Sequence, residues 1–487
     1  MLSRLNPFRG LPNPREVWAW GMYDLANQSF TLLIITLLFS LYVQQVVTPQ
    51  PVVTAEQLLQ LREAAEGALS PELEHLRDAI DRAQRIGAFR WSLMHGTSLL
   101  LVVILSPIIG ALGDLRGWRK EILVGTGIVC CALTCSLGLV GPGALVLAAL
   151  LYIPANICYQ IGENFLASFL PTISTPRNIG RISATGWTMG YVGALLLLIG
   201  ALAAMVLFDL RDVARWRPLF VFAGLWFAVN MIPTVLFLRD DAPQTRPSAD
   251  PHARSIVAAS IARVFETIKH AGHYRQLALF LTAFLIYGFG VQVIIGFASI
   301  IAGSFGFEQT HLVIFVAQIT VTAGIAAAAT SRFQDRIGAK TTVVIYLAVW
   351  IASCIGLITV KLIWPEHGPQ WPLWLIGNGL GIGLGGIGTA SRSMVGRLTP
   401  RHRTAEFFGL WGVSYKLAGA IGVLSFGTVA RAFGELASLC LLLSFFVVGL
   451  ILVLPVREIA GVRAARRAER THDFNTPSQP ATIEPPH

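Results

Sequence analysis

The sequence predicts an all-α membrane protein, with twelve transmembrane helices in two pseudo-symmetric six-helix bundles. The chain of 487 residues is 54% hydrophobic and only 13% charged, whereas about 25% of the residues in an average soluble domain are charged. So few charges cannot cover a water-soluble protein of this length, and the excess of apolar side chains must face lipid. Twelve long apolar stretches and an uneven distribution of Lys and Arg over the loops support the same fold.

The first six apolar stretches make residues 1–238 an N-terminal bundle. A helix needs about 20 mostly apolar residues to cross a bilayer. This criterion places spans near 17–43, 90–113, 121–140, 143–168, 183–207 and 217–238. Residues 239–275 follow as a polar cytoplasmic linker that contains Pro243, Pro247 and Pro251.

The other six stretches make residues 276–456 a C-terminal bundle. Its spans are expected near 276–303, 310–330, 341–361, 372–396, 405–432 and 434–456. The tail, 457–487, is basic and then rich in proline. We therefore expect a disordered cytoplasmic segment there.

The positive charges predict the orientation of the helices. With both termini in the cytoplasm, 25 of the 37 Lys and Arg residues lie in cytoplasmic segments, 9 in outer loops and 3 in spans. Cytoplasmic loops of membrane proteins carry such an excess. We therefore expect a multi-pass protein of the cell inner (plasma) membrane, surrounded by lipid. The basic residues are spread over short turns rather than one groove, which argues against nucleic acid as a partner.

The longest outer loop, residues 44–89, has the pattern of a helical hairpin. Apolar residues recur at helical spacing at Leu58, Leu61, Ala65, Leu69, Leu73, Leu76 and Ile80. Ser70 is expected to cap a helix with Pro71 at its first position and Glu72 in its first turn. We interpret the hairpin as a cap over the outer mouth of the bundles; a partner-binding role is the alternative.

Two cytoplasmic loops at equivalent places in the two halves share one motif. Residues 110–120 and 331–340 both contain a small residue, an Asp four positions later, and then Arg, Gly and Lys. The Asp can accept hydrogen bonds from a helix N-terminus, and the Gly allows a sharp turn. We expect the loops to act as a clasp on the cytoplasmic interface between the bundles; ordinary positively charged turns are the alternative. The residues concerned are Asp114, Arg116, Gly117, Asp335, Arg336 and Gly338.

These loops resemble the conserved loop motif of the major facilitator superfamily, although Leu115 and Ser331 depart from it. Three further stretches resemble the vacuolar amino-acid-effluxer-like family, named after an autophagy-associated protein. They are residues 20–30, residues 164–191, and residues 391–393 together with 405–409. The resemblance covers nearly the whole chain. It implies the major facilitator fold and, more loosely, amino-acid export.

Polar residues inside two spans mark a candidate pathway. They are Asp24, Asn27, Gln28 and Thr31 in span 1, and Asn156, Gln160, Glu163 and Asn164 in span 4. Each set follows one helix face, and an ionisable residue in a span costs about 2.5–3.5 kcal/mol on insertion scales. The first and fourth helices of a bundle line the cavity in the major facilitator fold. We therefore interpret both faces as cavity lining; hydrogen bonding between helices is the alternative.

Two cations also lie within spans. Lys416 is about 16 Å into span 11, close to the bilayer midplane, where it needs an acid, carbonyl oxygens or an anionic substrate. Arg392, nearer the cytoplasmic end of span 10, could form a gate with Asp24 and Glu163, or could extend to the membrane surface. Arg181 and Glu406 lie in neighbouring cytoplasmic loops and complete the candidate gate.

The sequence carries no catalytic motif, and we expect neither a cofactor nor a metal. Cys130, Cys131, Cys135, Cys158, Cys354 and Cys440 all fall in apolar stretches without metal-ligand spacing. Gly383 to Gly388 matches GxGxxG, but no strand precedes it, so we interpret its glycines as a helix-packing surface. His95 is interpreted as a packed polar residue.

These observations predict a secondary active transporter that moves a small polar solute, with amino acids as one class, by alternating access. We expect it to be a monomer. Proton coupling is a separate hypothesis, because Asp24 and Glu163 could bind and release protons as the bundles rock. A non-transporting receptor or assembly factor on the same fold is the alternative, and an intramembrane enzyme lacks the residues it would need.

Overall fold

The computed structural model describes residues 13–54, 56–57, 60–61, 70–175, 178–240, 274–364, 368–400 and 403–475. Regular structure within these ranges is helical throughout. Twelve of the helices are long and apolar enough to cross a membrane. The prediction of an all-α protein with twelve spans is therefore confirmed.

The first six spans form one bundle. Span 1, Pro14–Val47, consists of α1 (Pro14–Gln28), η2 (Ser29–Leu37), α2 (Leu38–Tyr42) and η3 (Val43–Val47). The other five spans are formed by α4 (Pro71–Arg116), α5 (Arg119–Ser136), α6 (Leu145–Ser168), α8 (Ile179–Leu207) and α9 (Arg217–Phe237). Short turns of helix, η5 (Leu137–Leu139), α7 (Leu170–Ile173) and η6 (Val213–Arg215), lie between them.

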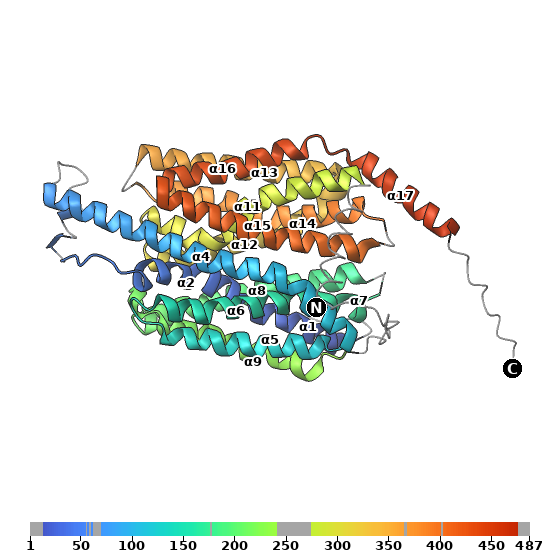
Figure 1. The fold of residues 1–487 in the computed structure, drawn as a ribbon, viewed down its shortest axis with the longest axis horizontal. Helices are drawn as coiled ribbons and strands as arrows, with labels where there is room; N and C mark the ends of the chain where they lie inside the picture. The colour runs from blue at the N-terminus through green and yellow to red at the C-terminus, as the bar shows by residue number, and fades with distance from the viewer. Residues whose placement is uncertain are drawn as a thin grey trace, which may run out of the picture.

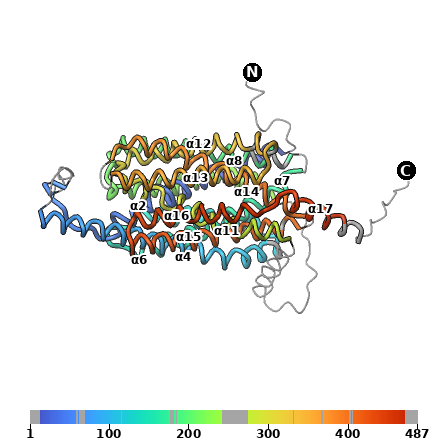
Figure 2. Tube along the Cα trace, turned by 90° about the horizontal axis from the view of Figure 1, so that it is seen from above, coloured from blue at the N-terminus to red at the C-terminus, as the bar shows by residue number. Residues whose placement is uncertain are grey.

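The second bundle repeats this plan. Its six spans are α11 (Arg275–Ser304), α12 (Gln309–Ile337), α13 (Ala339–Ile363), α14 (Trp371–Leu398), α15 (Thr404–Phe433) and α16 (Glu435–Val453). The two bundles meet along α4 with α15, along α8 with α12, and along η2 and α2 with α11. Figure 2 shows that the first two of these contacts lie on opposite sides of the molecule.

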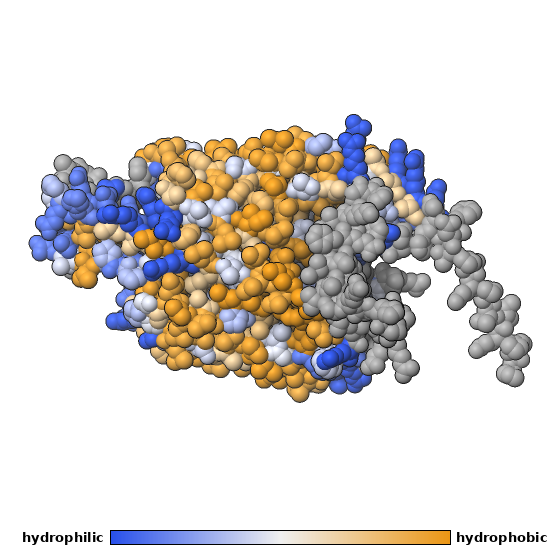
Figure 3. Space-filling view, viewed as in Figure 1, coloured by the Kyte–Doolittle hydropathy of each residue, from blue (hydrophilic) through white to orange (hydrophobic). Residues whose placement is uncertain are grey.

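The outer surface fits a bilayer. The spans lie side by side, and α1 begins at the same end of the molecule at which α16 finishes (Figure 1). Figure 3 shows a broad hydrophobic band across the face in view, with hydrophilic residues gathered towards the ends. Large apolar side chains of the spans are exposed, among them Leu150, Ile199, Leu236 and Ile325. Water would not tolerate so continuous an apolar surface, whereas lipid tails would cover it.

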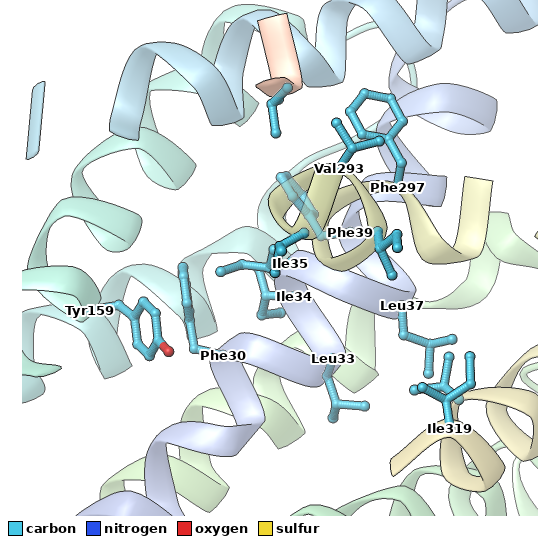
Figure 4. Close-up of a cluster of buried hydrophobic side chains, with 14 of the residues drawn as sticks. Phe30, Leu33, Ile34, Ile35, Leu37, Phe39, Tyr159, Val293, Phe297 and Ile319 are labelled. Atoms are coloured by element: carbon cyan, nitrogen blue, oxygen red, sulfur yellow. The ribbon is translucent and has the colours of Figure 1, made fainter. Parts of the chain in front are cut away.

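Span 1 is not a uniform α-helix. Residues Ser29–Leu37 form a π-helical segment directly after the polar residues Asn27 and Gln28. The segment carries buried apolar side chains that contact α11 and α12 of the other bundle. Figure 4 shows Leu37 beside Ile319, in the same cluster as Phe39, Val293 and Phe297. Span 1 is therefore part of the seal between the bundles.

Helix α4 differs in extent from the expected hairpin and separate span. It runs without a break over 46 residues. Its start is as predicted, because the Ser70 side chain accepts a hydrogen bond from the Leu73 amide at 3.4 Å and Pro71 occupies the first turn. The part before Arg90 extends about 28 Å and projects beyond the other helices (Figure 1). The preceding arm of the expected hairpin falls largely outside the described residues.

The expectation of a disordered tail is corrected over Glu458–Asn475, which form helix α17. Alanines and arginines dominate this stretch, and both have high helix propensity. One side of α17 packs on the bundle: Ala465 is buried, and Gly461 lies against Leu398 and Gln276. The proline-rich remainder and most of the expected linker, residues 241–273, lie outside the described residues.

Candidate functional site

The polar faces of α1 and α6 meet in the middle of the first bundle. The Asn27 side-chain amide donates a hydrogen bond to Glu163 Oε1. The Thr31 hydroxyl donates to Tyr159 Oη at 2.7 Å. Asn27 is buried, whereas Asp24 and Glu163 keep part of their surface exposed. The carboxylates therefore lie at the edge of a packed region rather than inside it.

Asp24 lies in the contact between α1 and α8. Its Oδ2 atom is 3.1 Å from the position that a Cβ atom would take at Gly190. Gly186, one turn earlier in α8, packs against the Trp20 ring, and a Cβ atom there would lie 2.4 Å from Trp20 Cζ3. The Gly186–Gly190 pair is therefore a packing motif between α8 and α1. Asp24 also interacts electrostatically with Glu163 and, across the bundles, with Arg392.

Lys416 joins the two bundles at mid-membrane. This residue of α15 is 7% exposed. Its Nζ atom donates to Gln160 Oε1 of α6 at 2.7 Å and lies 3.4 Å from the Gln160 carbonyl oxygen. Lys416 interacts electrostatically with Glu163, one turn further along α6. A buried ammonium group with carbonyl partners and a nearby carboxylate is well placed to receive an anionic group.

Arg392 lies in a less tightly packed part of the second bundle. Arg392 is exposed although it lies within a span, and its guanidinium lies 5.9 Å from the ring centre of Trp411. An added Cβ at Gly388, one turn earlier in α14, would meet nothing within 4 Å, and the same holds at Gly412 of α15. There is therefore room beside α14 and α15 between Lys416 and the end of the molecule at which α16 finishes.

Two members of the polar face of α6 point elsewhere. Asn156 donates to Ser98 Oγ at 2.6 Å, and Asn164 donates to Ser106 Oγ at 3.0 Å. Both partners belong to α4 of the same bundle. For these two residues the observed contacts are those of hydrogen bonding between helices.

Sequence reasoning missed the aromatic side of the site. Trp411 and Tyr415 of α15 lie with Phe284 of α11, with ring centres 5.5–6.4 Å apart. Tyr159, which stacks on Phe30 at 5.1 Å, provides an aromatic face from the first bundle. The aromatic spacing along α15 was visible in the sequence, but it is equally typical of a packed helix.

The half of the interface away from the start of α1 and the end of α16 is closed. The Trp91 indole of α4 donates to the Gly296 carbonyl of α11 at 2.7 Å. The hydroxyls of Ser40 and Ser299 are 2.9 Å apart across the bundles. With both termini in the cytoplasm, as the sequence predicts, this closed half would face the outside.

The two loop motifs make their described contacts within their own bundles. Gly117 and Gly338 have φ angles of 66° and 90°, so each provides the turn for which glycine is suited. Arg119 donates to the carbonyl oxygen of Ser168 at the end of α6. The amides of Ala339 and Lys340 donate to Glu458, a residue of α17.

The structure describes the remaining candidate gate residues only in part. The side chains of Asp114 and Asp335 fall outside the described part of the structure. Arg116 lies 4.6 Å from the Trp118 ring centre, and Arg181 and Arg336 are exposed. Glu406, in the first turn of α15, is 3.8 Å from Arg403 at the start of the same helix. An inter-bundle clasp at these loops stays a prediction.

The glycine-rich stretch of α14 is a packing surface, as predicted. Cβ atoms at Gly381 and Gly385 would collide with α12, and Cβ atoms at Gly383 and Gly386 would collide with α13. The six cysteines are free. Within the described ranges, no group of three or more His, Cys, Asp or Glu side chains could hold a metal ion.

The fold and the polar residues between the bundles define a transporter of the major facilitator class, not an enzyme. Solved structures of this class have the same fold. The human organic anion transporter MFSD10 superposes with a TM-score of 0.60 at 15% identity, covering 91% of this chain and 99% of that chain. The nucleoside transporter NupG (D323A mutant) gives a TM-score of 0.59 at 12% identity, covering 93% and 99%.

Within this class, the chain belongs to the vacuole effluxer Atg22-like family, whose model matches residues 12–466. An uncharacterized MFS-type transporter of Bacillus subtilis, YxiO, is 23% identical over 90% of this chain and 94% of its own length. Autophagy-related protein 22-1 of Aspergillus fumigatus is 25% identical over 63% of this chain and 53% of its own length. The chain thus matches only about half of that fungal relative.

Proposed function

We propose that this transporter carries a small polar solute through the space between the bundles by alternating access. The observation that carries the proposal is the contact of Lys416 with Gln160 at 2.7 Å. It links the bundles at mid-membrane, next to the carboxylates of Glu163 and Asp24. A substrate that takes the place of Gln160 on Lys416 would contact both bundles at the same time. Alternating access by rocking of the bundles requires a central site of this kind.

Amino acids are the substrate class that fits these charges best. The α-carboxylate would take the place of the Gln160 carbonyl oxygens on Lys416. The ammonium group would lie towards Glu163 or Asp24, which keep partial exposure. The family description of a vacuole effluxer supports a role in export.

Proton coupling belongs to the same proposal. Asp24 and Glu163 influence one another electrostatically, and each also acts on a cation of the second bundle. Movement of the bundles changes the distance from each carboxylate to its cation, and so changes its affinity for a proton. Arg392 with Asp24 would form the cytoplasmic gate, together with the two loop motifs.

We place the protein as a monomer in the plasma membrane, with both termini in the cytoplasm. The excess of Lys and Arg in the loops on the side of the termini supports this orientation. Labelling of single cysteines in the outer loop before α4 and in α17, from either side of intact cells, tests it. Labelling of α17 from outside would reverse the assignment.

Proteoliposomes and a panel of labelled amino acids test the transport proposal. We expect flux in the parent protein and at least about ten-fold less in Lys416→Met, because the anchor for the carboxylate is lost. Arg211→Gln, which removes an exposed cation between α8 and α9, away from the loop motifs and the central site, is the control. Equal flux in Lys416→Met and the parent would exclude Lys416 as the anchor. A pH-gradient dependence that survives in Asp24→Asn with Glu163→Gln would exclude these acids as proton sites.

A further inference from the structure

A buried histidine lies in the outer seal between the bundles, away from the carboxylates of the central site. His95 of α4 is 2% exposed. Its ring stacks on Trp91 with centres 5.3 Å apart and planes 4° apart. Its Nδ1 atom is hydrogen-bonded to Tyr152 Oη of α6 at 2.7 Å. The imidazole is therefore held on one side by its own bundle.

The second bundle closes the other side of the imidazole. An added Cβ at Gly296 of α11 would lie 3.2 Å from His95 Cδ2 and 3.5 Å from Nε2. Val423 of α15 packs at the same glycine. Gly296 also accepts the hydrogen bond of Trp91. The ring is thus part of the contact that shuts the outer side.

The groups that face His95 carry no charge. α6 presents the Tyr152 hydroxyl, α11 presents Gly296, α15 presents Val423, and α4 itself presents Trp91. In the described residues, no carboxylate or cation acts on the imidazole. An imidazolium formed in this closed contact would be shielded from solvent and would face no counter-ion among the described groups, so the contact disfavours it.

Opening of the outer side would make the protonated form of His95 more favourable. His95 lies five residues after Arg90 in α4, which is about 8 Å along the helix. Separation of α4 from α11 would let outer water reach the ring. A hydrated imidazole takes up a proton at about pH 6.5. A proton on His95 therefore favours the state that is open to the outside, because a ligand shifts an equilibrium towards the state that binds it better.

We propose that His95 is a proton-binding site of the outer gate. One imidazole nitrogen takes a proton from outer water when the gate is open, and the same proton must return to water before α4 and α11 close again. The proposal rests on alternating access, but it assigns the proton to a residue separate from Asp24 and Glu163. Acid on the outer side then holds the transporter open to that side.

Spin labels on the two bundles report the outer gate directly. Leu207 and Leu362 lie near the outer ends of α8 and α13 and are 77% and 61% exposed. Both residues are replaced by cysteine in the full chain, after the six native cysteines have been removed, and the spin labels are attached to the two new cysteines. A control pair within the first bundle uses Leu139 and Leu207. Double electron–electron resonance then gives the distance distributions at about pH 8 and about pH 5, either side of the imidazole range.

For the parent, we expect the longer inter-bundle distance to gain at least about two-fold in population at the lower pH. His95→Gln should lose more than about half of this response, while the control pair stays constant and shows that the fold is intact. Tyr152→Phe keeps the imidazole and should keep the response. An absent response in the parent, or a response retained in His95→Gln, overturns the proposal. Because the distances need no substrate, a failure to find flux would count against the transport proposal alone.

Discussion

Arg397 at the end of α14 forms an ion pair with Glu458 of α17, with Nη1 2.9 Å from Oε1. The same carboxylate accepts hydrogen bonds from the Ala339 and Lys340 amides at 3.3 and 2.9 Å. Glu458 therefore caps the start of α13 and joins it to two other helix ends. A carboxylate in that position satisfies free amides and opposes the positive end of the helix.

The first prediction concerns this cap. Glu458→Gln should lower the free energy of unfolding by about 1 kcal/mol, because charge-assisted bonds to two amides and a guanidinium are weakened. Thermal unfolding of the detergent-purified protein measures the loss. Asp78→Asn, at an exposed residue two turns into α4, should have little effect. Equal stability of both variants would show that the cap contributes nothing.

The second prediction concerns the contact of α1 with α8. Gly190→Ala places a methyl group 3.1 Å from Asp24 Oδ2 and 3.5 Å from Gln28 Nε2. These side chains must move, so transport should fall several-fold while the protein still folds. Gly125→Ala in α5 is the matched control, because its Cβ would meet nothing within 4 Å. Replacement of a helical glycine there should even stabilise the protein by about 0.5–1 kcal/mol. Flux equal in the two variants would contradict a role for the position of Asp24.

A third prediction tests the packing of α14. The Cβ of Gly385→Ala would fall 1.9 Å from the Ala323 carbonyl oxygen of α12. A backbone atom cannot move aside as the end of a flexible side chain can. We therefore expect the free energy of unfolding to fall by about 3 kcal/mol, or the variant to express poorly. Gly388→Ala, in the same helix, has open space around its Cβ and should be tolerated. Thermal stability and yield compare the two, and a tolerated Gly385→Ala would refute close packing of α12 with α14.

A fourth prediction addresses the closed outer side. Ser40→Cys with Ser299→Cys, whose hydroxyls are 2.9 Å apart in the parent, should form a disulfide under mild oxidation. The bond would hold the bundles together on the outside and stop flux, and a reductant should restore it. Each single cysteine variant should transport under both conditions. Full flux through the cross-linked protein would mean that this contact need not open.

Part of the site could be predicted from the sequence, because polar residues are rare in membrane spans and are therefore easy to recognise there. Asp24, Asn27, Gln160 and Glu163 stand out against their apolar neighbours, and the structure brings them together. Asn156 was equally conspicuous, yet it binds Ser98 of α4. A helix pattern gives the face on which a residue lies, but not the helix that this face will meet.

Other features leave little trace in a sequence. The π-helical turns of Ser29–Leu37 lie in a mostly apolar run, and the Ser and Thr residues within it do not indicate a change of helical period. The cap on α13 comes from Glu458, more than a hundred residues away, in a stretch whose composition suggested disorder. Both features depend on tertiary packing, which local propensity does not record.

The length of α4 has a mechanical consequence. The projecting part and the membrane span of α4 belong to one continuous helix. A force on the projecting part is therefore transmitted to the contact between α4 and α15. Insertion of a single residue between Ser70 and Arg90 would turn the projecting part about 100° around the helix axis without moving the span. Movement of the projecting part of α4 is therefore coupled to the contact of α4 with α15 inside the membrane.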